Sequence, residues 1–123
     1  MIAMAEILIV DDAAIMRKNI ELMLRNAGHK VISKAKNGRS AYQEYKLHQP
    51  DIMTMDINMP QITGVEAAEK ITAEFPEAKI IMISTVDKKM EIFKALQAGA
   101  ADYILKPVNS KVLVEKIETL LAE

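Results

Sequence analysis

Six polar residues follow short apolar runs in this 123-residue sequence. They are three carboxylates, two hydroxyls and one amine, namely Asp11, Asp12, Asp56, Ser84, Thr85 and Lys106. Carboxylates that lie together raise one another's pKa unless a cation shares the site. Because the sequence has no cysteine and neither histidine stands near these acids, the ligands would all be hard oxygens. Such a ligand set favours Mg²⁺ or Mn²⁺ over zinc.

The lysine and the hydroxyls indicate what the cation would assist. The acids outnumber Lys106, so charge neutralisation alone does not explain a lysine among them. A lysine, a divalent metal and a hydroxyl around one carboxylate form a site for an incoming phosphoryl group. That carboxylate can itself be the nucleophile and form an aspartyl phosphate. Taken singly, Asp11 and Asp12 could be a helix cap and Ser84 a plain strand-end hydroxyl, but their joint placement favours the phosphoryl site.

The apolar runs that precede these residues are typical of buried parallel strands. Five such runs alternate with segments of helical period, at residues 6–10, 30–34, 52–55, 79–83 and 102–105. This alternation requires crossover connections, which predict an α/β fold with helices on both faces of a five-stranded parallel sheet. The run at 30–34 alternates with polar residues, which indicates a strand near an edge. Binding sites of such sheets lie at the carboxyl ends of the strands, so the six polar residues are expected together there.

The helical segments carry clear stop signals, at Gly28, Pro50, Pro76 and Gly99. We expect Asp87 to cap the fourth helix, and Ile92, Phe93 and Leu96 to face inward from it. The two histidines, His29 and His48, are expected in solvated loop or helix-end positions. The nine methionines are expected to be packing residues.

Composition restricts the class of protein. The length fits one domain over residues 1–123, and a net charge of −1 argues against non-specific binding to nucleic acid. The absence of cysteine excludes disulfides and thiolate chemistry and fits a cytoplasmic location. The apolar runs are too short to cross a membrane, and residues 1–5 lack the features of a signal peptide.

Four short motifs resemble the response-regulator receiver family, and the likeness extends over residues 6–121. They are Val10-Asp11-Asp12, Asp56 followed by Asn58-Met59-Pro60 and Gly64, Ile83-Ser84, and Lys106-Pro107. The resemblance implies a doubly wound (βα)5 flavodoxin-like fold with strand order 2-1-3-4-5. It also implies a CheY-like, single-domain regulator that accepts a phosphoryl group and is not a turnover enzyme.

The same resemblance assigns the centre of the site. Asp56 would be the phosphoacceptor. Asp12 and Asp56 would bind Mg²⁺ directly with the backbone carbonyl of Asn58, and Asp11 would act mainly through water. Lys106 would pair with the phosphoryl group.

The surroundings of the site are assigned in the same way. Ser84 would move to bond a phosphoryl oxygen, and Tyr103 would swing between exposed and buried rotamers, although it could also be a plain strand aromatic. Thr85 and Val86 would border the approach of the hydrolytic water. The Lys106–Pro107 peptide bond is commonly cis in this family.

The implied partners are a sensor histidine kinase and a downstream target protein, which is either the flagellar switch or a phosphotransfer protein. The protein would act as a monomer, with no nucleic acid and no membrane insertion. A phosphorelay shuttle and a fragment of a longer regulator remain alternatives. A Mg²⁺-dependent aspartyl phosphatase is disfavoured because Asn58 stands where such enzymes place a second aspartate. An FMN-binding protein is disfavoured because no Ser/Thr/Gly-rich phosphate loop follows the first strand.

Overall fold

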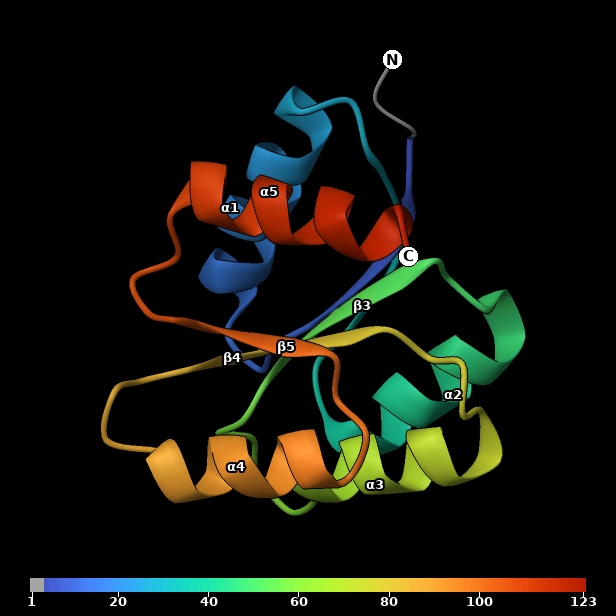
Figure 1. Cartoon of the computed structure of the whole chain (residues 1–123), viewed down its shortest axis with the longest axis vertical. Helices are drawn as coiled ribbons and strands as arrows, with labels where there is room; N and C mark the ends of the chain where they lie inside the picture. Colours follow the sequence, from blue (N-terminus) through green and yellow to red (C-terminus); the bar gives the residue numbers. More distant parts are fainter. Residues whose placement is uncertain (1–3) are drawn as a thin grey trace.

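The computed structural model describes residues 4–123 and shows a five-stranded parallel sheet between two layers of helices (Figure 1). The strands are β1 (Glu6–Val10), β2 (Lys30–Ala35), β3 (Ile52–Asp56), β4 (Ile80–Ser84) and β5 (Asp102–Leu105). The helices are α1 (Ala14–Asn26), α2 (Gly38–His48), α3 (Gly64–Glu74), α4 (Lys89–Gln97) and α5 (Ser110–Leu121). The sheet order is β2-β1-β3-β4-β5, which confirms the predicted fold class and strand order.

The two helical layers explain the unbroken apolar runs of the central strands. α1 and α5 cover one face of the sheet, and α2, α3 and α4 cover the other (Figure 1). Ile7 and Ile9 pack in the core under α1 and α5, whereas Leu8 and Val10 pack in the core on the opposite face. Side chains of a strand alternate between faces, so a strand covered on both sides must be apolar at every position.

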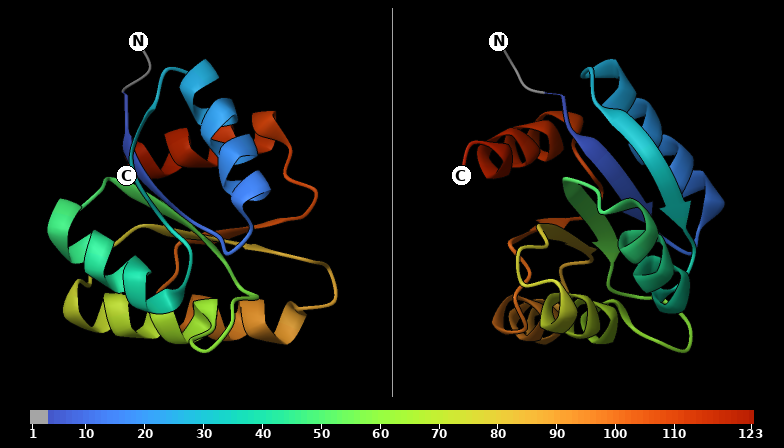
Figure 2. Two further views of the ribbon diagram at one scale, coloured as in Figure 1. Left: turned by 180° about the vertical axis from the view of Figure 1, so that it is seen from behind. Right: turned by 90° about the vertical axis from the view of Figure 1, so that its right-hand side faces the viewer.

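β2 lies at the outer edge of the sheet, as its alternating pattern predicted, and Figure 2 shows it between α1 and α2. Lys30 and Lys34 are exposed, and Ile32 and Ser33 are half-buried. Every residue of β3, by contrast, is buried. Because β2 pairs only with β1, its other backbone edge is not paired within the sheet.

Helix ends follow the predicted signals. Gly28 and Gly99 adopt positive φ angles of 90° and 118° directly after the C-cap residues of α1 and α4, which is a conformation that favours glycine. At the start of α3, the Thr63 hydroxyl accepts from the backbone N–H of Glu66 at 3.2 Å, and the Glu66 carboxylate accepts from the N–H of Thr63 at 3.1 Å. This reciprocal capping box fixes the helix start at Gly64.

The predicted cap of α4 is wrong. α4 begins at Lys89, and Lys88 occupies the N-cap position without a side-chain hydrogen bond. The Asp87 carboxylate instead accepts a hydrogen bond from the Thr85 hydroxyl. A short polar side chain in a loop can bond a neighbouring group instead of the helix backbone, and here Asp87 bonds the hydroxyl two residues earlier.

The predicted inward face of α4 is only partly correct. Ile92 is buried, but Phe93 is 55% exposed and Leu96 is 36% exposed. Ala95 completes the buried stripe instead. α4 lies beside the terminal strand β5, and no further strand of residues 4–123 extends the sheet to cover the outer side of the helix. Two large apolar side chains therefore remain at the surface.

The expectation for His29 is also wrong, because this side chain is buried. Its Nδ1 accepts a hydrogen bond from the backbone N–H of Ala5 at 3.0 Å, and its Nε2 lies 4.0 Å from Oε2 of Glu118. The turn between α1 and β2, which carries His29, therefore lies against α5. His48 is exposed, as expected.

The methionines divide between core and surface. Four are buried against the sheet and confirm the expected packing role: Met53, Met55, Met59 and Met82. Met4 and Met90 are exposed. Between residues 4 and 123, no helix is long and apolar enough to cross a membrane. The signal-peptide expectation rests partly on residues 1–3, which lie outside the described part of the chain.

Candidate functional site

The predicted site residues meet at the carboxyl edge of the sheet. Parallel register pairs Val10 with Met55 and Asp56 with Ile83, and it pairs Ser84 with Leu105. The residues at or directly after these strand ends therefore reach the same edge from four neighbouring strands. Asp11 comes from β1, Asp56 from β3, Ser84 from β4 and Lys106 from β5, as predicted.

The three aspartates form a compact group of oxygens. One carboxylate oxygen from each of Asp11, Asp12 and Asp56 lies within 4.8 Å of the others. Asp11 is 1% exposed; its Oδ1 accepts from the backbone N–H of Ala13 at 2.9 Å, whereas its buried Oδ2 has no hydrogen-bond partner among residues 4–123. Burial, opposed by the Ala13 bond, raises the pKa of the Asp11 carboxyl. An unsatisfied buried oxygen among three acids fits a hard divalent cation such as Mg²⁺.

Asp56 is the acid that contacts the lysine. It is 3% exposed, and its Oδ1 lies 3.2 Å from Nζ of Lys106. Burial raises the pKa of the Asp56 carboxyl, and the Lys106 ammonium and the Asn58 backbone counteract part of this effect. The charge of Asp12 pushes the same pKa upward again. The ionised form of Asp56 is thus stabilised by the Lys106 ammonium and destabilised by burial and by the charge of Asp12.

Ser84 is buried at the end of β4, and its hydroxyl is engaged with the backbone. The hydroxyl donates to the backbone carbonyl of Thr85 at 3.0 Å. The backbone N–H of Lys106 donates to the carbonyl of Ser84 at 2.7 Å, which ties the two strand ends together. The peptide bond between Lys106 and Pro107 is cis.

The remaining predicted residues lie around the rim. Asn58, Thr85 and Val86 are exposed, Val86 by 61%. Tyr103 is also exposed and belongs to a separate apolar cleft of about 270 Å³ between α4 and β5. The lining of this cleft is Val86, Lys89, Ile92, Phe93, Leu96, Tyr103 and Leu105. The structure therefore brings the acids, the lysine and Ser84 together, and it places Tyr103 on a neighbouring surface.

Arg17 supports the site and was not predicted, and Gly64 was named only as part of the family motif, with no role at the site. Arg17 donates from Nη1 to the backbone carbonyl of Asp11 at 2.7 Å and so holds the loop that carries two of the acids. Gly64 has room for no side chain, because a Cβ there would lie 2.8 Å from Cα of Ile57 and overlap the carbonyl oxygen of Asp56. The sequence position of Arg17 could have indicated this role. Arg17 lies one turn into α1, where its backbone N–H bonds the carbonyl of the N-cap residue Ala13, so its side chain can reach the loop before the helix.

Comparison with known proteins gives a consistent result. Residues 7–118 match the family model of the response regulator receiver domain. The chain is 42% identical to the chemotaxis protein CheY of Thermotoga maritima, over 90% of this chain and 92% of that protein. It is 43% identical to CheY of Bacillus subtilis, over 94% and 96% of the two chains. A solved CheX–CheY–BeF3–Mg complex from Borrelia burgdorferi matches with a TM-score of 0.90 and 29% identity, covering 96% of this chain and 90% of the other.

Proposed function

The chain belongs to the response regulator receiver domain family, and from that premise we propose that it signals by accepting a phosphoryl group on Asp56 from a sensor histidine kinase. As a CheY-like regulator of a two-component system, it belongs with signalling phosphoacceptors. The two CheY relatives compared above are chemotaxis proteins, so a chemotaxis role is favoured over a phosphorelay shuttle. We place its action in the cytoplasm.

One observation carries this proposal: Asp56 is the buried acid that lies against both Lys106 and the other two aspartates. In the proposed step an Asp56 carboxylate oxygen attacks the phosphorus of a phosphohistidine. The new P–O bond forms as the P–N bond breaks, and the electron pair leaves with the imidazole nitrogen, which then takes a proton. Lys106 stabilises the charge on the transferred group.

The residues present fit a bound Mg²⁺. Asp12, Asp56 and the backbone carbonyl of Asn58 would hold it directly, and the free Oδ2 of Asp11 would act through water. A bound Mg²⁺ supplies Lewis-acid stabilisation of phosphoryl oxygens. Mn²⁺ has the same ligand preference and is expected to substitute.

Wild-type protein is expected to gain one phosphoryl group from acetyl phosphate or phosphoramidate when Mg²⁺ or Mn²⁺ is present, and none when the metal is removed with EDTA. The reason is that the three acids repel an incoming anion unless a cation shares the site. Intact mass gives the stoichiometry. Borohydride reduction of the aspartyl phosphate followed by peptide mapping locates it. Metal-independent labelling, or a label on a peptide without Asp56, would rule out the proposed chemistry.

Lys106→Ala is expected to leave the fold intact but to uncouple phosphorylation from the change of shape. Lys106 is partly exposed and contacts the site acid directly, so its removal takes away the group that senses the phosphoryl charge. Affinity for Mg²⁺ should rise slightly, since a nearby positive charge is lost. Amide chemical shifts before and after phosphorylation measure the coupling. Wild-type shift changes in the variant would contradict this role of Lys106.

We propose that the apolar cleft between α4 and β5 carries the output. Phe93, Leu96, Tyr103 and Leu105 are exposed there, and β5 connects directly to Lys106 at the site. The Ser84 hydroxyl, now bonded to Thr85, would turn to a phosphoryl oxygen and free space for Tyr103 to move inward. The partner would be a target protein of the chemotaxis machinery, with the flagellar switch as the candidate.

Thr85→Ala and Val86→Glu are each expected to speed loss of the phosphoryl group. Thr85 and Val86 stand exposed beside the site, where they crowd the approach of water, and neither orients a water as a carboxylate would. A tenfold change in rate needs only about 1.4 kcal/mol of barrier, which modest crowding supplies. The measurement is the decay of phosphorylated protein in excess Mg²⁺. Unchanged decay in both variants would show that these side chains do not control access.

A further inference from the structure

A second cleft lies beside the site, on the β2 edge of the sheet. Its volume is about 510 Å³, and it opens between α1, the end of β2 and the start of α2. It is lined by Arg17, Lys34, Ala35, Lys36, Ser40 and Glu44. We call it the β2 cleft. It shares no residue with the acids of the site or with the apolar cleft between α4 and β5.

The β2 cleft has an excess of positive charge although the whole chain carries a net charge of −1. Three of its lining residues are cations, Arg17, Lys34 and Lys36, and one is an acid, Glu44. Glu44 already accepts a hydrogen bond from Ser33, and it lies 3.4 Å from Nε2 of His48. Glu44, the acid among the lining residues, thus already interacts with two side chains that do not line the cleft.

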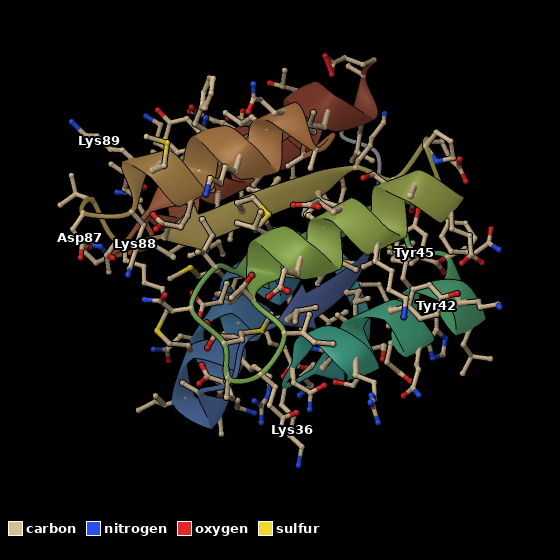
Figure 3. The ribbon with its side chains drawn as sticks, turned by 90° about the horizontal axis from the view of Figure 1, so that it is seen from below. Lys36, Tyr42, Tyr45, Asp87, Lys88 and Lys89 are labelled. Atoms are coloured by element: carbon tan, nitrogen blue, oxygen red, sulfur yellow. The ribbon has the colours of Figure 1, made fainter. Side chains whose placement is uncertain are left out.

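The cations of the β2 cleft differ in how far they are engaged. Lys34 lies 2.7 Å from the buried carboxylate of Glu21. Lys36 is exposed, pairs with no carboxylate within residues 4–123, and projects outward beside the start of α2 (Figure 3). Lys36 is therefore the cation that can meet an incoming anion without giving up a partner.

The strand beside the cleft supplies a second means of recognition. β2 is the end strand, so the backbone of its outer edge is unpaired within the sheet. Unpaired edges accept an extended peptide as an added strand, and side chains along the edge then select it. Lys30 and Lys34 on this edge disfavour pairing with a second, equally basic copy. The same lysines favour an added strand that carries acidic side chains. A small anion could not bind in this way, because it has no backbone to pair with β2.

The β2 cleft also touches the backbone of the metal-site loop. The carbonyl of Ala35 accepts from the N–H of Asp11 at 3.1 Å, and Arg17 donates to the carbonyl of Asp11 at 2.7 Å. Ala35 and Arg17, which both line the cleft, therefore bond the backbone N–H and the backbone carbonyl of Asp11. A ligand in the cleft would lie against the supports of Asp11.

We propose that the β2 cleft docks an extended acidic segment of a partner protein along the free edge of β2. The charge of the cleft and the unpaired strand edge together define this partner chemistry. The surface is distinct from the proposed output cleft, so one domain could hold two partner segments at once. Docking requires neither metal nor a phosphoryl group on Asp56.

The test is a titration of unphosphorylated, metal-free protein with a capped peptide of alternating glutamate and threonine at low ionic strength, followed by amide chemical shifts. We expect saturable shifts in the segment from Lys34 to Ser40. Lys36→Glu should weaken binding roughly fivefold, because one attractive charge contact becomes repulsive. Lys111→Glu makes the same charge change at an exposed position at the start of α5, outside the β2 cleft and outside the apolar cleft between α4 and β5, and should leave the affinity unchanged.

Three results would overturn the proposal: no saturable binding, shifts confined to other elements, or equal weakening by Lys36→Glu and Lys111→Glu. The last result would show attraction to net charge only. A peptide with lysine in place of glutamate is the control. It could still add to the edge of β2 as a strand, but its charge is repelled by the cleft, so it should not bind. Since the protein is unphosphorylated throughout, failure here is separate from failure of the labelling experiment on Asp56.

Discussion

Asp56→Asn is expected to abolish phosphorylation and, at the same time, to raise the free energy of unfolding at neutral pH. The first effect follows because an amide cannot attack phosphorus as a carboxylate does. The second follows because Asp56 is 3% exposed and stands among two other acids. Asparagine keeps the shape and removes the charge, for a gain on the order of 1 to 2 kcal/mol.

The pH dependence provides a sharper form of this prediction. Burial raises the pKa of both Asp11 and Asp56 in the folded protein above their ordinary value of 3.8. The folded state thus holds protons that the unfolded state has already released. The stability these groups contribute is present below the ordinary carboxyl pKa and is lost as pH rises through the raised values. In Asp56→Asn, the part of this pH-dependent loss of stability that Asp56 causes is absent.

Urea unfolding in metal-free buffer, from the ordinary carboxyl range up to neutral pH, measures both effects. Wild type should lose stability over this interval from these two groups, and Asp56→Asn should lose less. Because other groups titrate in both proteins, the difference between the two curves is the quantity to compare. Parallel curves, or a variant less stable than wild type at neutral pH, would contradict a strained anion at Asp56.

Gly64→Ala is expected to destabilise the protein and to impair phosphorylation although the substitution adds only a methyl group. The new Cβ would overlap the Asp56 carbonyl oxygen and lie 2.8 Å from Cα of Ile57. Both obstacles are backbone, so the end of β3 must shift and carry the nucleophile with it. Overpacking of this kind costs about 1 to 3 kcal/mol.

Gly38→Ala is the matched control, because Gly38 also opens a helix directly after a capping residue. There a new Cβ would meet Cγ2 of Ile62 at 2.6 Å, Cβ of Ile62 at 2.9 Å and its carbonyl oxygen at 3.1 Å. Ile62 belongs to the loop before α3, so relief requires a shift of that loop and not of the end of β3. We expect a smaller loss of stability and normal labelling. Thermal unfolding and acetyl phosphate labelling of the two variants give the comparison. Equal labelling of Gly64→Ala and Gly38→Ala would show that the close approach at Gly64 does not position Asp56.

The sequence was sufficient to predict the sheet and the meeting of the acids with Lys106. Both depend on short-range patterns: apolar runs that end in polar residues, and alternation that forces parallel strands. When strands are parallel, the positions after their ends share one edge regardless of the distances along the chain. The strand order rested on family resemblance instead, since the alternation alone permits several orders.

Apart from the Asp87 cap, the errors concern residues whose surroundings are set by distant elements. Phe93 and Leu96 have inward-facing spacing, but burial depends on whether a further strand covers that side of α4. His29 follows a helix-ending glycine, which is typical of an exposed turn, yet α5 covers it with Glu118 nearby. The spacing of residues in one helix contains no information about either neighbour.

The site described above draws on both halves of the chain: Asp11 follows the first strand, and Lys106 follows the last. During synthesis the three acids and Ser84 emerge before β5, and the lysine that pairs with Asp56 follows β5. A growing chain therefore contains the acids without their cation. The acids and the lysine meet only once β5 has joined the sheet, so a molecule released before β5 would carry three acids at that edge without Lys106.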